Sequence, residues 1–253
     1  MYMGQVNFEV KVNLINVNQG FEYLTPKLRI DADDLTVELL ASLTFHLVGT
    51  PTRAISMVNN IMSRRKEQGI KGRPMFLWEP VPGRCSPEEW NDCIKAMELV
   101  DVISPNVNEA SGFLGKIVDE EQPFENFKVQ VEEISREYVS HQIGLNGAAV
   151  LRCGKHGCFV ATRTEMKWLP AYHQSPEKVV DPTGGGNAFC GGFCVGWVRS
   201  GGDFIKAAEY GSIAASFIIE QYGLPRLEVD CDGEKWNGNT IKCRQEAYRK
   251  LCG

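Results

Sequence analysis

The chain has 253 residues, of which 43% are hydrophobic and 23% are charged, and acidic residues outnumber basic residues by 32 to 27. This ordinary globular composition excludes wholesale disorder and a fibrous repeat, and the length predicts one large domain or two small ones. A broad phosphate-binding footprint requires an excess of Lys and Arg, so the net charge of −5 argues against nucleic acid as a partner.

Short apolar runs alternate with helix-length amphipathic runs from about residue 40 onward. The apolar runs predict strands over residues 45–48, 75–78, 102–104, 148–151 and 158–161. The amphipathic runs predict helices over about 55–62, 90–97, 105–115, 124–141, 186–199 and 204–221, with Ser86 and Asp203 as N-caps. The alternation at residues 6–14 is typical of an edge strand, and the last 25 residues indicate a loop and a terminal helix.

The predicted strands are apolar along their whole length and alternate with helices, which predicts an α/β fold with a mostly parallel sheet covered by helices on both faces. Residues 154–157 form a glycine-bearing turn between two strands, with the character of a hairpin. In parallel sheets, ligands bind outside the carboxyl ends of the strands, where glycine-rich turns meet helix N-termini. The glycine-rich segments are therefore the first candidates for a site.

The strongest candidate is the segment from Asp181 to Asn187, which contains three consecutive glycines directly before a predicted helix. Glycines at a helix N-terminus let unpaired backbone N–H groups and the positive end of the helix dipole face a bound anion. The segment matches neither a Walker loop nor G-x-G-x-x-G, and a flexible turn is the alternative. Gly191 and Gly192, inside the helix, indicate close packing of a neighbouring element.

The cysteines and the N-terminus bear on the cellular compartment. The nine cysteines include no C-x-x-C pair, and Cys190 and Cys194 lie beside apolar residues, so we favour a structural role over a metal site. The N-terminal residues lack the pattern of a signal peptide, and no apolar run reaches the ~18 residues of a membrane helix. We predict a reduced protein in the cytoplasm, or alternatively the nucleus, without a membrane partner.

The segment 181–187 resembles the second signature of the pfkB family of carbohydrate kinases, D-T-x-G-A-G-D. Residues 105–109 resemble the family pattern P-N-x-x-E, residues 151–157 resemble its strand and turn T-x-G-x-x-G, and residues 207–223 resemble the helix that closes the adenine side. The resemblance covers about residues 42–225 and implies one ribokinase-like domain over 1–253. The triple glycine and residues 23–27 are most similar to the fungal Mak-type proteins of this family.

The resemblance implies ATP and Mg²⁺ as cofactors, with a nucleotide and a sugar or nucleoside as partners. It places Gly184, Gly185 and Gly186 at the transferred phosphate, and it assigns Asn106 and Glu109 to Mg²⁺ and the phosphates. The residues that it places near the nucleotide are Asn106, Glu109, Gly154, Gly157, Asp181 and Thr183. Without the resemblance, Asn106 and Glu109 would simply cap the helix that starts there.

The sequence departs from the family pattern at three places. Asn187 stands where the family has an Asp that acts as general base, and a carboxamide cannot accept that proton near neutral pH. Arg152 stands where the family usually has Thr. No Gly-Gly pair precedes Gly184, so we expect the N-terminal sugar-binding and lid parts to be incomplete or diverged.

Three functions are therefore open. The leading one is an ATP-binding kinase homologue whose phosphoryl transfer to a sugar-like hydroxyl is weak or lost. The alternative is a non-catalytic scaffold or regulatory protein that keeps the fold, whereas a dinucleotide-dependent oxidoreductase is disfavoured because no G-x-G-x-x-G follows an early strand. Two side chains have open roles: Glu79 would line the cleft or lie exposed, and for His156 we favour a solvated loop position over a nucleotide contact.

Overall fold

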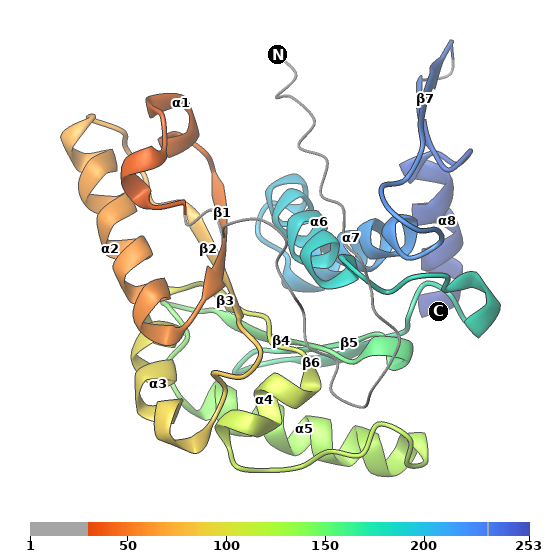
Figure 1. Ribbon diagram of the computed structural model, residues 1–253, viewed down its shortest axis with the longest axis horizontal. Coiled ribbons are helices and arrows are strands. Elements are labelled where there is room, and N and C mark those ends of the chain that lie inside the picture. The colour runs from red at the N-terminus through yellow and green to blue at the C-terminus, as the bar shows by residue number, and fades with distance from the viewer. Residues whose placement is uncertain (1–29, 232) are drawn as a thin grey trace, which may run out of the picture.

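The structure is a computed structural model that describes residues 30–231 and 233–253, so the predicted edge strand at 6–14 lies outside the described residues. A six-stranded sheet in the order β1-β2-β3-β4-β5-β6 forms its centre (Figure 1). The strands are β1 (Thr44–Gly49), β2 (Met75–Pro80), β3 (Val102–Ile103), β4 (Ala148–Arg152), β5 (Cys158–Ala161) and β6 (Met166–Leu169). Strands β1 to β4 are parallel, and β4, β5 and β6 are antiparallel. The prediction of a mostly parallel α/β sheet is confirmed.

Helices cover both faces of the sheet (Figure 1). They are α1 (Val37–Leu40), α2 (Pro51–Glu67), α3 (Trp90–Leu99), α4 (Val107–Phe113), α5 (Phe124–Ser140), α6 (Gly185–Ser200), α7 (Phe204–Ile218) and α8 (Ile241–Cys252). Four 3-10 turns lie at Ala32–Asp34, Pro87–Glu89, Gly154–His156 and Pro176–Lys178. Within the described residues, no helix has the length and apolar character needed to cross a membrane.

Successive side chains of the strands point to opposite faces, and each set packs against a different group of helices. Phe76 and Trp78 lie in the core with α2, α3, α4 and α5, whereas Met75 and Leu77 lie in the core with α6 and α7. All six residues of β2 are buried, which explains why residues 75–78 of this strand are apolar without alternation.

The helix starts agree with the capping rules at one of the two predicted N-caps. The side chain of Asp203 accepts a hydrogen bond from the Lys206 N–H at 3.0 Å, which confirms it as the cap of α7. Ser86 was predicted to cap the helix that contains Trp90, and this prediction is wrong. A 3-10 turn over Pro87–Glu89 separates Ser86 from α3, and the Ser86 side chain makes no capping bond.

Two features of the described chain were not predicted from the sequence. Strand β6 extends the β4–β5 hairpin, and β7 (Leu227–Asp230) pairs with β8 (Gly233–Trp236) in a separate hairpin. Strand β7 alternates apolar and polar residues, which is a strand signal that the sequence analysis did not use, and all four of its residues are exposed. The predicted terminal helix is confirmed as α8, where buried Tyr248 packs with Ile213 and Phe217 of α7.

The glycine pair inside α6 serves close packing at one position only. A Cβ at Gly192 would lie 2.5 Å from the Cβ of Ala214 on α7, so the predicted close packing is confirmed there. Gly191 is exposed and has no atom within 4 Å of its virtual Cβ, so the same prediction is wrong for Gly191.

These two neighbouring glycines make a matched pair of substitutions. We expect Gly191→Ala to raise the free energy of unfolding by about 0.5–1 kcal/mol, because alanine favours the helix and meets no neighbour. We expect Gly192→Ala to lower it by about 1–3 kcal/mol, because the methyl group overlaps α7. Urea unfolding of both variants measures the difference, and a change of equal sign and size in the two would contradict the packing described.

Candidate functional site

The triple glycine begins α6 at the carboxyl end of the sheet. Gly184 adopts a left-handed conformation with a φ of 82° at the N-cap position, which an L side chain rarely adopts. The carboxylate of Asp181 accepts a hydrogen bond from the Thr183 N–H at 2.9 Å and so shapes the turn. In the first helical turn the N–H groups of Gly186 and Asn187 have no acceptor inside the helix, and they lie at its positive end.

A cavity of about 810 Å³ lies beside this turn. It brings together five of the residues predicted from the sequence: Asn106, Gly154, Gly157, Gly185 and Gly186. Apolar and small side chains of α6 and α7 complete one wall, namely Phe189, Ser212, Ala215, Ser216 and Ile219. The other predicted site residues do not line the cavity: Glu109, Asp181, Thr183, Gly184 and Asn187.

Asn106 and Glu109 bind each other at the start of α4. The Asn106 side chain accepts from the Glu109 N–H at 2.8 Å, and the Asn106 N–H donates to Oε2 of Glu109 at 2.8 Å. This reciprocal pair is a capping box, so the capping role is present whatever else the two residues do. Glu109 is only 6% exposed.

Arg152 connects Glu109 to a second buried carboxylate. Its Nη1 lies 2.7 Å from Oε1 of Glu79, and its Nη2 lies 3.4 Å from Oε2 of Glu109. His46 contacts the other oxygen of Glu79 at 2.8 Å. A Cβ at Gly186 would overlap Nη1 of Arg152, so the third glycine of the turn is required for the guanidinium to lie there.

The two carboxylates respond differently to burial. Burial would raise the pKa of Glu79, but the hydrogen bond from His46 and the positive charge of Arg152 outweigh it and lower the pKa below 4.5. Burial raises the pKa of Glu109, and the Asn106 N–H and the Arg152 charge offset this only in part. Glu79 is therefore the firmly ionised partner of Arg152.

The atoms predicted to bind Mg²⁺ are engaged within the protein. Oε2 of Glu109 accepts from the Asn106 N–H and faces Arg152, so a divalent cation at this oxygen would meet the repulsion of the guanidinium. A Mg²⁺ ion bound directly to this oxygen would therefore require that Arg152 move away, whereas the predicted contact is made through water.

The structure also brings together a group of potential metal ligands that the sequence did not connect. Ligand atoms of His46, Glu79 and Cys190 lie within 4.8 Å of one another. Burial raises the pKa of the Cys190 thiol, and Arg152 already neutralises Glu79, so the structural role predicted for Cys190 is the better description.

Two side chains differ from their predicted roles. Glu79 is 8% exposed and does not line the cavity, so both predicted alternatives for it are wrong. His156 lies against the rings of Phe124 and Phe127, at 5.2 and 4.6 Å between centroids, and it lines the cavity rather than a solvated loop. The sequence signal for the buried ion pairs of Glu79 and Glu109 was Arg152, which stands where the family usually has Thr. It could not identify the two partners, because they are distant from Arg152 along the chain.

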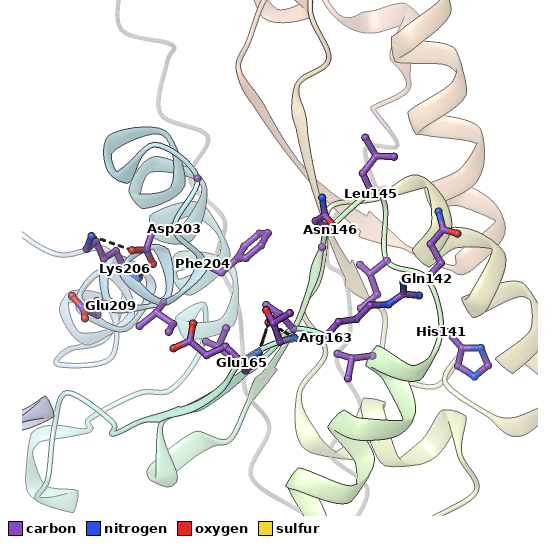
Figure 2. Close-up of a pocket in the computed structure, with 18 residues that line it drawn as sticks. His141, Gln142, Leu145, Asn146, Arg163, Glu165, Asp203, Phe204, Lys206 and Glu209 are labelled. Atoms are coloured by element: carbon purple, nitrogen blue, oxygen red, sulfur yellow. Dashed lines mark hydrogen bonds and ion pairs between the residues drawn. The ribbon is translucent and has the colours of Figure 1, made fainter.

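A second cavity, of about 530 Å³, lies at the opposite end of the β4–β5 pair (Figure 2). Residues before β4, the β5–β6 turn and the start of α7 surround it, and Figure 2 shows Arg163, Glu165 and Phe204 among its lining. Asp203 pairs with Lys206 at 3.0 Å in its wall. No residue predicted for the site lines this second cavity.

Residues 81–227, more than half of the chain, match the sequence model of a family described as pfkB family carbohydrate kinase. The chain belongs to the pfkB family. An uncharacterised protein of Schizosaccharomyces pombe is 33% identical over 90% of this chain, and the protein MAK32 of Saccharomyces cerevisiae is 32% identical over 92%. This chain spans 65% of the length of each of these two relatives.

The fold agrees with solved members of the ribokinase-like group. The adenosine kinase of Anopheles gambiae, in complex with P1,P4-di(adenosine-5) tetraphosphate, superposes with a TM-score of 0.52 at 19% identity. The superposition covers 77% of this chain and 60% of the adenosine kinase. Since the identity is low, this likeness supports the fold and not the substrate. The ribokinase-like architecture predicted for this pfkB chain is confirmed.

The ion pair of Glu79 predicts a pH-dependent contribution to stability. At neutral pH we expect Glu79→Gln to lower the free energy of unfolding by about 2–4 kcal/mol, because Arg152 loses its closest charged partner. The folded pKa of Glu79 is lowered, so its contribution is present above 4.5 and disappears as the pH falls through that lowered value.

Urea unfolding at about pH 7 and about pH 3 tests this expectation, with the difference between variant and wild type shrinking at the lower pH. The control is Glu89→Gln, which removes a more exposed pair with Arg84 and should change stability by less than about 1 kcal/mol. An equal effect of Glu79→Gln at both pH values would contradict the assignment.

Proposed function

We propose that the chain binds ATP in the cavity beside α6 and that its phosphoryl transfer to a sugar-like hydroxyl is weak or lost. The observation that carries this proposal is the meeting of Asn106, Gly154 and Gly157 with Gly185 and Gly186 around one cavity. These residues come from three separate segments of the chain, and each segment resembles a pfkB motif.

The lining of the cavity suits the two halves of a nucleotide. The first turn of α6 offers backbone N–H groups to the phosphates, and Arg152 and Lys155 add positive charge. Val179, Ala215 and Ile219 offer an apolar wall for the base. The diadenosine tetraphosphate in the mosquito adenosine kinase is a ligand of the same chemical class.

The chemistry of transfer is weakened at residue 187. Asn187 lies exposed in the first turn of α6, at the position of the family's general base. An amide does not take up the acceptor's proton, although positioning and charge neutralisation alone support a slow rate. The acceptor, a sugar or nucleoside, is proposed from the pfkB family alone.

Three further predictions accompany the proposal. Mg²⁺ at Asn106 and Glu109 stays a prediction, since both residues are engaged with each other and Glu109 faces Arg152. Cytoplasmic localisation stays a prediction from the cysteines and the N-terminal residues, and the absence of nucleic acid as a partner stays a prediction from the charge balance. The non-catalytic scaffold remains the alternative, and Asn187 is the residue that favours it.

The proposal predicts direct nucleotide binding. We expect ATP to bind the protein with a dissociation constant of roughly 1 μM to 1 mM, measured by isothermal titration calorimetry. Lys155→Glu should weaken binding roughly threefold to tenfold, because it places a negative charge in the cavity lining. Lys66→Glu, an equal charge change on exposed α2, should have no effect. If no heat of ATP binding is detected with or without Mg²⁺, the proposed function is wrong.

A carboxylate placed at residue 187 distinguishes a weak kinase from a non-catalytic scaffold. We expect Asn187→Asp to raise the rate of ATP hydrolysis or of transfer to added sugars and nucleosides by roughly 10²-fold, because it supplies the missing base. Asn59→Asp makes the same charge change on an exposed position of α2 and should leave the rate unchanged. A rate that stays at the wild-type level in Asn187→Asp, while ATP still binds, would favour the scaffold.

A further inference from the structure

Arg152 lies where a divalent cation would balance the buried carboxylates. The guanidinium is placed between Glu79, at 2.7 Å, and Glu109, at 3.4 Å, and its side chain is 14% exposed. Residue 152 ends β4, and its backbone forms a bridge with Asn106 at the start of α4. The strand therefore fixes the backbone of residue 152, and the two ion pairs hold its guanidinium.

The carboxylates face Arg152 and not the cavity. Glu79 and Glu109 are 8% and 6% exposed, and neither lines the cavity. Within the described part of the chain, the cavity lining contains no Asp or Glu, whereas it contains Arg152 and Lys155. Glu79 and Glu109 therefore lie behind the guanidinium as seen from the cavity, and Lys155 is paired with the exposed Glu121 at 2.8 Å.

The guanidinium lies beside the N-terminus of α6 and also lines the cavity. It lies against the backbone of Gly186, so two positive groups, the guanidinium and the N-terminus of α6, face the same space. The Nε of Arg152 is buried and has no hydrogen-bond partner among the described residues. An anion at the edge of the guanidinium and the first turn of α6 would accept charge-assisted hydrogen bonds from both, in addition to the ion pairs that Arg152 already makes.

We infer that Arg152 takes the place of the divalent cation, so that this site binds a nucleoside polyphosphate in its metal-free form. The inference rests on the proposed function, since it concerns how the same cavity neutralises the phosphates. An Arg guanidinium keeps its charge at every physiological pH and binds phosphate oxygens with two parallel hydrogen bonds. Glu79 and Glu109 then hold the guanidinium in place and have no metal to coordinate.

The test compares ATP binding to the wild-type chain in excess Mg²⁺ and in excess EDTA by isothermal titration calorimetry. We expect the two affinities to agree within about twofold. A wild-type protein that binds ATP only in Mg²⁺ overturns this inference and leaves the proposed function standing. A protein that binds ATP in neither buffer overturns the proposed function itself.

Replacement of the guanidinium gives the second arm. Arg152→Thr should lose metal-free ATP affinity by roughly tenfold or more and recover it in Mg²⁺, because the two carboxylates are released. Arg163→Thr, the same change in the exposed β5–β6 turn outside this cavity, should bind as the wild type does. Metal-free binding that is equal in Arg152→Thr and the wild type overturns the inference.

A metal titration without nucleotide tests directly whether Arg152 occupies the place of a divalent cation. With Mn²⁺ alone and detection by electron paramagnetic resonance, we expect no bound Mn²⁺ at these carboxylates in the wild type and one bound ion in Arg152→Thr. A wild-type signal that disappears in Glu109→Gln would show a metal at Glu109 and overturn the inference. The wild-type measurements stand on their own if Arg152→Thr does not fold.

Discussion

The buried ion pairs of Arg152 constrain the carboxyl end of the sheet. A guanidinium that is 14% exposed requires charged partners, because an unpaired buried charge costs several kcal/mol. Its partners, Glu79 and Glu109, end β2 and begin α4, and Arg152 itself ends β4. One side chain thus ties three elements together at the edge where ligands bind in parallel sheets. The same side chain requires a glycine at position 186, because a Cβ there would overlap Nη1.

The position of Arg152 affects the cavity from the N-terminus of α6 to the apolar wall formed with α7. Gly186 lets α6 begin directly over Arg152, and further along the same helix Gly192 and Gly196 allow the close approach of α7. Helix α7 then contributes Ser212, Ala215 and Ser216 to the cavity lining. The glycines of α6 have two separate structural effects: Gly186 leaves room for Arg152 at the start of the helix, and Gly192 and Gly196 allow packing against α7 in its middle. Both effects are needed for the cavity to have its observed walls.

Features with a local cause were predictable from the sequence. The strands buried on both faces appear as continuous apolar runs, and the Asp203 cap and the hairpin turn at 154–157 rest on contacts within a few residues. Strand β7 alternates apolar and polar residues over only four positions, a signal too short to predict its pairing with β8 from the sequence. The ion pairs of Arg152 join residues 73 and 43 positions apart along the chain, as the numbers of Glu79 and Glu109 show. Pattern reasoning marked Arg152 as a departure from the family, and only the fold identifies its partners.

In the proposed function, binding and transfer depend on different atoms of the site, and the departures from the family affect the two steps unequally. The anion-binding part of the turn consists of backbone N–H groups, which remain whether residue 187 carries a carboxylate or an amide. The part that accepts a proton is the side chain of residue 187 alone, and there the carboxylate is absent. Arg152 acts in the same direction, because it adds a fixed positive charge to the anion site and engages a carboxylate that a metal would use. In the proposed function, the chain therefore keeps backbone donors that could hold a phosphate and lacks the side chain that would accept the proton during transfer.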